Sequence, residues 1–249
     1  MEIKSVTPGG QSLPDLNQPY DCLNDLAPES YTVPPREVRS AFERQAIEAA
    51  RRGDYQQAIV MFNQLIEQDA NNATAYHNRG LAHFHIRQFT AAMADYTTAL
   101  QLNPRLGKVY NSRGNCYAAM GDLIHAIIDY EAAIDLNPLD LQAWINRGIT
   151  FRELKLHEIA LENFDLALEF SQLLNQTESK EAIALLEGHI YAERGRSHDL
   201  FGDWNWAVSD YQQALNTLPP SDQLGTPLSQ RLRLQVSQWL NALLSGLNH

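Results

Sequence analysis

Hydrophobic positions recur along much of the chain at the spacing of a single helical face. The segment 91–100 shows the pattern, with apolar side chains at Ala91, Ala92, Ala94, Tyr96 and Leu100. This spacing predicts helices that each bury one side. Glycine–aspartate pairs at 53–54, 121–122 and 202–203 and prolines at 104 and 138 predict the turns between them, because proline cannot continue a helix. The chain is therefore predicted to be all-α.

The same pattern returns every 34 residues. Its markers are the glycines Gly80, Gly114, Gly148 and, after an additional 13 residues, Gly195. An alanine lies twelve residues after each glycine, at Ala92, Ala126, Ala160 and Ala207, and an aromatic residue lies four further on, at Tyr96, Tyr130, Phe164 and Tyr211. A weaker first copy has Ala46 in place of the glycine and Phe62 as the aromatic. A fixed period of this length indicates stacked structural repeats.

The period, the spacing and the residue types resemble the tetratricopeptide repeat family, in which each repeat is a pair of antiparallel helices. The resemblance covers residues 39–221 as five repeats, at 39–72, 73–106, 107–140, 141–174 and 188–221, with an insertion at 175–187. It implies a right-handed superhelix, an α-solenoid. Each pair would bury its apolar face only by stacking on its neighbour.

A polar pair recurs with the same period. An arginine precedes each glycine, and an acidic or amide residue precedes each second-helix aromatic, giving the pairs Arg79/Asp95, Arg113/Asp129, Arg147/Asn163 and Arg194/Asp210. We interpret these as links between the two helices of a repeat, weakened in the fourth copy by the neutral Asn163. The alternative is a column of arginines that holds an acidic ligand.

The segments outside the repeats have different predicted roles. Residues 1–38 contain six of the eleven prolines and predict an extended or disordered arm, which either remains free or docks on the repeats. Residues 222–249 predict a capping helix that starts with Thr226 and Pro227; a dimerising helix is the alternative. The insertion contains no helix breaker at 179–187, so it is expected to lengthen the first helix of the fifth repeat.

Composition and motifs exclude several functions. A net charge of −11 argues against nucleic-acid binding, and no apolar run is long enough for a membrane helix. The first residues do not resemble a signal peptide, so a cytoplasmic location is expected. No catalytic, phosphate-binding or dinucleotide-binding motif occurs, and neither Cys22 and Cys116 nor His83 and His85 have metal-ligand spacing. We expect no enzyme, cofactor or metal site.

The resemblance implies that the first helices of the repeats line a concave groove that binds a protein or peptide. The matching positions are His77, Asn78 and Leu81 in the second repeat, Lys108, Asn111, Ser112 and Asn115 in the third, Gln142, Asn146, Ile149 and Arg152 in the fourth, and Arg196 in the fifth. Amide side chains both donate and accept hydrogen bonds, which suits an extended backbone. Ordinary solvated helix faces are the alternative.

One branch of the family grips the C-terminal carboxylate of chaperones with a clamp of two lysines, two asparagines and an arginine. Over the first three repeats only Asn78 and Lys108 match this clamp, and Glu43 would repel a carboxylate. Chaperone-tail binding is therefore not expected. Two roles remain: a scaffold or adaptor in a stable complex, or an assembly factor that acts transiently. The repeats are similar in composition to those of many bacterial repeat proteins, including assembly factors of photosynthetic complexes.

Overall fold

The computed structural model describes residues 41–174, 179–218 and 227–247, and over these ranges the chain forms eleven helices and no strand. The helices are α2 (Ala41–Arg51), α3 (Tyr55–Gln68), α4 (Ala73–His85), α5 (Phe89–Leu102), α6 (Gly107–Ala119), α7 (Leu123–Leu136), α8 (Leu141–Glu153), α9 (His157–Leu174), α10 (Lys180–Phe201), α11 (Trp204–Thr217) and α12 (Pro227–Leu247). The prediction of an all-α solenoid is confirmed. The predicted arm at 1–38 lies outside the described residues.

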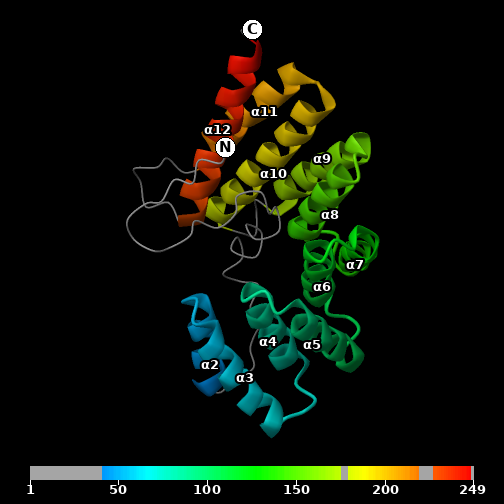
Figure 1. The fold of residues 1–249 in the computed structure, drawn as a ribbon, viewed down its shortest axis with the longest axis vertical. Coiled ribbons are helices and arrows are strands. Elements are labelled where there is room, and N and C mark those ends of the chain that lie inside the picture. Colours follow the sequence, from blue (N-terminus) through cyan, green and yellow to red (C-terminus); the bar gives the residue numbers. More distant parts are fainter. Residues whose placement is uncertain (1–40, 175–178, 219–226, 248–249) are drawn as a thin grey trace, which may run out of the picture.

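The helices form successive antiparallel pairs, from α2/α3 to α10/α11, and each pair packs on the next (Figure 1). The first four pairs fall within the predicted ranges of the first four repeats. The fifth pair begins earlier than 188, because α10 starts at Lys180 and has 22 residues where α4, α6 and α8 have 13. The last helix, α12, begins at Pro227 and packs on α10 and α11.

The turn inside each repeat contains one residue in the left-handed conformation. Three of the five are glycines, Gly53, Gly121 and Gly202, with φ between 81° and 95°. Arg87 and Lys155 occupy the same position in the second and fourth repeats, with φ of 60° and 62°. Since a side chain is disfavoured there, these two turns tolerate strain of about 1 kcal/mol that a glycine would avoid.

The repeat glycines allow the two helices of a pair to approach closely. A Cβ atom built on Gly114 would lie 2.6 Å from Cε1 of Tyr130, a ring that is completely buried. Gly80, Gly148 and Gly195 face the aromatic residue of their own repeats at 2.6–2.9 Å in the same way. The recurring glycine and aromatic therefore form one packing unit, which explains why they share a period.

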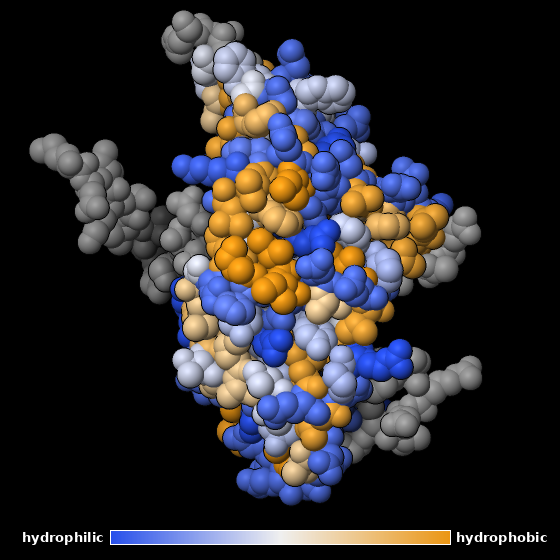
Figure 2. Space-filling view, turned by 90° about the vertical axis from the view of Figure 1, so that its right-hand side faces the viewer, coloured by the Kyte–Doolittle hydropathy of each residue, from blue (hydrophilic) through white to orange (hydrophobic). Residues whose placement is uncertain are grey.

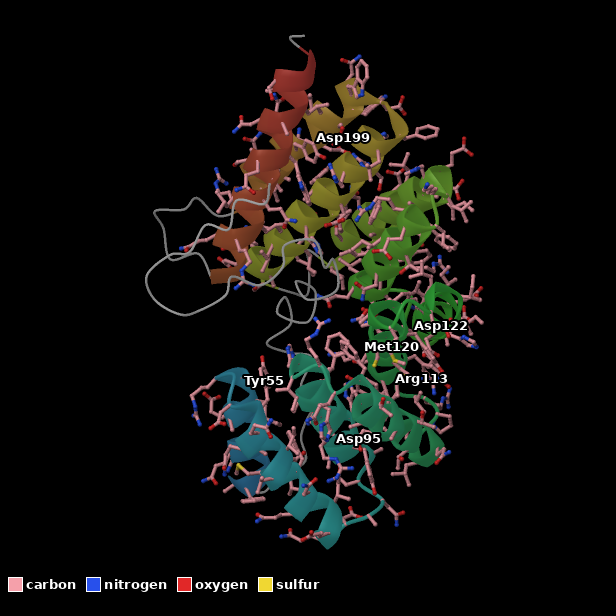
Figure 3. All side chains as sticks on the ribbon, in the orientation of Figure 1. Tyr55, Asp95, Arg113, Met120, Asp122 and Asp199 are labelled. Atoms are coloured by element: carbon pink, nitrogen blue, oxygen red, sulfur yellow. The ribbon has the colours of Figure 1, made fainter. Side chains whose placement is uncertain are left out.

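The predicted arginine–carboxylate links are confirmed. Arg113 donates from Nε and Nη2 to the two carboxylate oxygens of Asp129, both at 2.7 Å, and Arg79 and Arg194 form the same paired contact with Asp95 and Asp210. Figure 3 labels Arg113 and Asp95 on the ribbon. The hydrogen bonds to Asp129 raise the pKa of Arg113. Paired contacts between these groups are strong because both partners are charged.

The fourth repeat differs because its partner is neutral. Arg147 donates from Nε to Oδ1 of Asn163 at 2.7 Å, while Nδ2 of Asn163 donates to the carbonyl of Ile159, also at 2.7 Å. In contrast to Arg113, whose pKa is raised, Arg147 has its pKa lowered by burial. The guanidinium lies over the ring of Trp144, 4.6 Å from its centroid. The other three repeat arginines make the same cation–π contact at 5.3–5.5 Å, so this contact is shortest where the charge pair is missing.

Candidate functional site

All twelve predicted partner-binding residues lie on α4, α6, α8 and α10, whose common surface we call the groove face. Their exposure differs more than the sequence suggested. Seven are buried: His77, Asn78, Leu81, Ser112, Asn115, Asn146 and Ile149. Asn111, Gln142, Arg152 and Arg196 are half-buried, and Lys108 is exposed. A partner could touch the second group directly, whereas the first group lies between helices.

The buried asparagines connect neighbouring repeats. Nδ2 of Asn146 on α8 donates to Oδ1 of Asn111 at 2.9 Å and to Oδ1 of Asn115 at 2.8 Å, both on α6. The hydroxyl of Tyr130 also donates to Oδ1 of Asn115, at 2.8 Å. Successive first helices lie side by side, so an amide that points along the face meets the next helix before it meets solvent. These amides therefore fix the spacing of the groove face.

A second contact joins the second and third repeats. His77 Nε2 lies 3.0 Å from the hydroxyl of Ser112, which itself donates to the carbonyl of Lys108 at 2.9 Å. Because the hydroxyl has one proton and uses it on the carbonyl, Nε2 of His77 must be the donor. Burial, and then the charge of Lys108, lower the pKa of His77 to about 3. The imidazole is therefore neutral at physiological pH.

A buried charged group joins the fourth and fifth repeats. Nη1 of Arg152 lies 2.6 Å from Oε2 of Glu193 and donates to the Glu193 carbonyl at 3.1 Å, and Nε2 of His189 lies 3.6 Å from Oε1 of Glu193. Burial opposes the charge on Glu193, but Arg152 and His189 outweigh it and lower its pKa to about 2. Glu193 aligns with Asn146 of the preceding repeat, so an ion pair joins α8 to α10 where amide contacts join α6 to α8.

Some buried polar atoms of the groove face have no hydrogen-bond partner in the part of the protein that the structure describes. Among the described residues, both amide atoms of Asn78, Oδ1 of Asn146 and Nδ1 of His189 are buried without a hydrogen-bond partner. Asn78 is completely buried. A buried polar atom without a partner costs about 1–3 kcal/mol, so native proteins retain few of them. Within the described ranges, Nδ1 of His157 and Nδ1 of His198 are also buried without a hydrogen-bond partner, so such atoms are not confined to this face.

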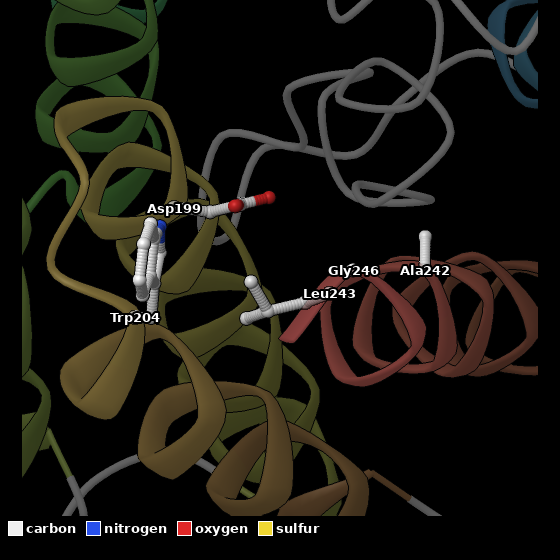
Figure 4. A pocket seen from close by; sticks show the side chains of 5 residues that line it. All are labelled: Asp199, Trp204, Ala242, Leu243 and Gly246. Carbon is white, nitrogen blue, oxygen red and sulfur yellow. The ribbon is translucent and has the colours of Figure 1, made fainter. Parts of the chain in front are cut away.

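Two hollows lie along the array. The smaller, of about 130 Å³, is bounded by Thr74 and His77 of α4 and by the turn that leads to Lys108. The larger, of about 370 Å³, lies at the end of the array between α10, α11 and α12, and Figure 4 shows its lining of Asp199, Trp204, Ala242, Leu243 and Gly246. The first hollow adjoins two of the predicted residues, whereas no motif in the sequence indicated the second.

Family models match the chain between residues 49 and 139. A TPR repeat model matches residues 49–86, and a tetratricopeptide repeat model matches residues 73–106 and 107–139. Residues 49–139 thus match tetratricopeptide repeats. The tetratricopeptide repeat family is a class of non-enzymatic protein-interaction scaffolds.

Relatives and solved structures agree with this assignment. Tetratricopeptide repeat protein 28 of Homo sapiens is 37% identical over 65 residues, which are 26% of this chain and only 3% of the human protein. A thermophilic TPR protein of Thermus thermophilus superposes with a TM-score of 0.62 at 18% identity, covering 80% of this chain and 96% of that one. MamA superposes with a TM-score of 0.58 at 17% identity, covering 73% and 96%. At these identities the structures show a shared fold.

The tetratricopeptide repeats described here provide no other candidate chemistry. Within the described ranges, no three His, Cys, Asp or Glu side chains are grouped to hold a metal ion. None of the helices the structure describes is both long enough and apolar enough to span a bilayer. Cys116 is a free, buried thiol, and burial raises its pKa to about 12, so it is a packing residue.

Proposed function

We propose that this protein is an interaction scaffold that holds an extended segment of a partner protein along its groove face. The side chains of Lys108, Asn111 and Gln142, which a partner could reach on α6 and α8, carry the proposal. Side-chain amides pair with a peptide backbone in either direction. The solved relative YrrB, with a TM-score of 0.53 at 16% identity over 79% of this chain and 90% of its own, is titled a TPR protein with an unusual peptide-binding site, which is a precedent for peptide binding by the fold.

The accessible residues make the direct contacts in this proposal. Lys108 is exposed beside the smaller hollow, and Asn111, Gln142, Arg152 and Arg196 are half-buried on successive first helices. The seven buried residues position these side chains through the contacts between helices. A partner segment that lies across α6, α8 and α10 would therefore meet amides first and then the cation Arg196, because the side chain of Arg152 is only 10% exposed and is paired with Glu193.

The proposal does not include a chaperone-tail clamp. Of the two residues that match that clamp, Asn78 is completely buried and Lys108 is the only one exposed. A single lysine cannot enclose a carboxylate on two sides, as a clamp of several donors does. We therefore propose an internal segment of the partner as the ligand.

Photo-crosslinking tests the position of the partner. A photoreactive amino acid is placed at Gln142 on the groove face or, as a matched control, at the exposed Gln212 on α11, and each protein is exposed to native lysate. We expect one protein to crosslink from position 142 and not from 212. A Lys108→Ala/Gln142→Ala variant should then lose that partner, while Lys180→Ala/Gln212→Ala retains it. Retention by both variants would place the partner elsewhere.

The photo-crosslinking experiment also distinguishes the two possible roles, a scaffold of a stable complex and a transient assembly factor. If the captured protein is present with all the subunits of a finished complex, the chain is a scaffold or adaptor of that complex. If it appears only as an unassembled subunit, the chain is an assembly factor, and the identity of the subunit decides whether the complex is photosynthetic.

A further inference from the structure

Large hydrophobic side chains are exposed along one edge of the array, away from the groove face. The turns α6–α7, α8–α9 and α10–α11 lie on the same side of the ribbon, on the right in Figure 1. We call their exposed residues the apolar edge: Met120, Ile124, Leu156, Ile159, Phe201 and Trp206. Their exposed fractions run from 39% for Ile159 to 63% for Trp206. Figure 2 looks onto this side and shows a hydrophobic area at mid-height.

A ring contact joins the apolar edge of the fourth repeat to that of the fifth. The ring of Phe201, at the end of α10, lies 5.8 Å from the ring of His157, at the start of α9. Trp206 stacks on His198 with 6.1 Å between ring centroids and still keeps most of its surface exposed. Apolar surface of this kind is rarely left open over several neighbouring residues in a monomer without an interaction to make.

The fold does not require these residues to be apolar. In the repeat alignment, Ile124 corresponds to Thr90 in the second repeat and to Gln56 in the first. Leu156 corresponds to Gln88 and, in the first repeat, to Asp54. The first two repeats therefore form the same helix pairs with polar residues at these positions. Among the third to fifth repeats, Ile124 aligns with Glu158 and Asn205, and Leu156 aligns with Asp122 and Asp203. A packing role would apply to every repeat, so an exposed apolar residue at one of these positions in a single repeat points to an external contact.

The charge around the edge limits what could cover it. The second helices α7, α9 and α11 contain no lysine or arginine, and exposed carboxylates flank the edge at Glu158, Glu162 and Asp203. Lys155 is the one exposed basic residue in the α8–α9 turn. A second copy of this chain would bring the same carboxylates together, which is unfavourable. A basic partner would be attracted instead.

The backbone of the edge limits the shape of the partner. Except at its ends, each helix uses its amide and carbonyl groups for its own hydrogen bonds, so the edge offers no extended row of backbone groups for strand addition, and side chains must provide the contacts. Apolar residues spaced along one face of a helix match such a surface. We propose that the apolar edge docks an amphipathic helix of a partner protein, with its apolar face on Ile124, Ile159 and Trp206 and with lysines or arginines beside Glu158 and Glu162.

A synthetic helix tests this proposal on the full chain. The probe is a fluorescent peptide of about 18 residues, or five turns, with leucines on one face and lysines elsewhere, followed by fluorescence anisotropy. An Ile124→Gln/Ile159→Gln/Trp206→Gln variant should bind it about tenfold more weakly or worse. The control is Val60→Gln/Leu173→Gln/Leu234→Gln, which replaces residues that are 50–60% exposed elsewhere and should bind within about twofold of the original.

Other binding partners of the apolar edge would give different experimental results. Equal binding by the edge and control variants, or equal binding of a peptide with glutamates in place of the lysines, would overturn the proposal. So would dimerisation in analytical ultracentrifugation that only the edge variant loses, because the occupant would then be a second copy. Flotation with phosphatidylserine vesicles that only the edge variant loses would instead assign the edge to a membrane. Since these substitutions avoid the groove face, partner capture from position 142 should be unchanged.

Discussion

The neutral partner of Arg147 allows a charge pair to be restored by one substitution. Asn163→Asp would give the fourth repeat the paired contact that Arg113 and Asp129 make in the third. A hydrogen bond between charged groups contributes about 1.5–3 kcal/mol, against about 1 kcal/mol for the neutral bond that Asn163 loses to the Ile159 carbonyl. We expect the free energy of unfolding to rise by about 1 kcal/mol, and Tm by about 2–4 °C.

The assay is urea and thermal unfolding followed by circular dichroism, in a double-mutant cycle with Arg147→Met. Asn163 is 3% exposed, so without Arg147 the new carboxylate would be buried and unpaired, and Asn163→Asp should then destabilise the protein by about 2 kcal/mol or more. The stabilisation should also disappear as the pH falls below about 4, where aspartate becomes protonated. If Asn163→Asp has the same effect with and without Arg147, the reasoning about this pair is wrong.

Three further predictions rest on burial. Gly114→Ala should destabilise the protein by about 1–3 kcal/mol, because the new methyl meets the ring of Tyr130 at 2.6 Å, whereas Gly107→Ala, whose nearest neighbours are at 3.5 Å, should not; chemical denaturation compares the two. His77 has a pKa of about 3 in the fold, so the unfolded chain binds its proton first, and stability should fall as the pH drops below about 6.5, by about 2 kcal/mol at pH 5; His77→Gln should remove that loss. Cys116, with its pKa raised to about 12, should react with a thiol reagent only as fast as the array opens.

Most of the fold could be predicted from the 34-residue period of the sequence. The period placed arginine opposite carboxylate, because the two residues lie within one repeat and recur with it. The packing of each glycine against the aromatic of its own repeat came from the structure. The strained turns at Arg87 and Lys155 could also have been anticipated, since both residues align with Gly53 and Gly121.

The groove face was harder to predict because burial there depends on how closely successive repeats stack. The period aligns Asn146 with Ser112, but it does not show that Asn146 donates to Asn111 and Asn115. The ion pair of Arg152 with Glu193 was missed for the same reason, since it joins two repeats across the insertion. The apolar edge was visible in the sequence only as isolated hydrophobic residues next to turns.

The absence of basic residues from the second helices has a practical consequence for mapping this protein. Trypsin cleaves after lysine and arginine, and α3, α5, α7, α9 and α11 contain neither. Each second helix is therefore released whole within a single tryptic peptide, bounded by cuts in the first helices or the turns. Cleavage after Arg79, Arg113, Arg147 or Arg194 requires that arginine to leave its partner. The order in which tryptic fragments appear from the folded protein would thus report, repeat by repeat, which part of the array opens first.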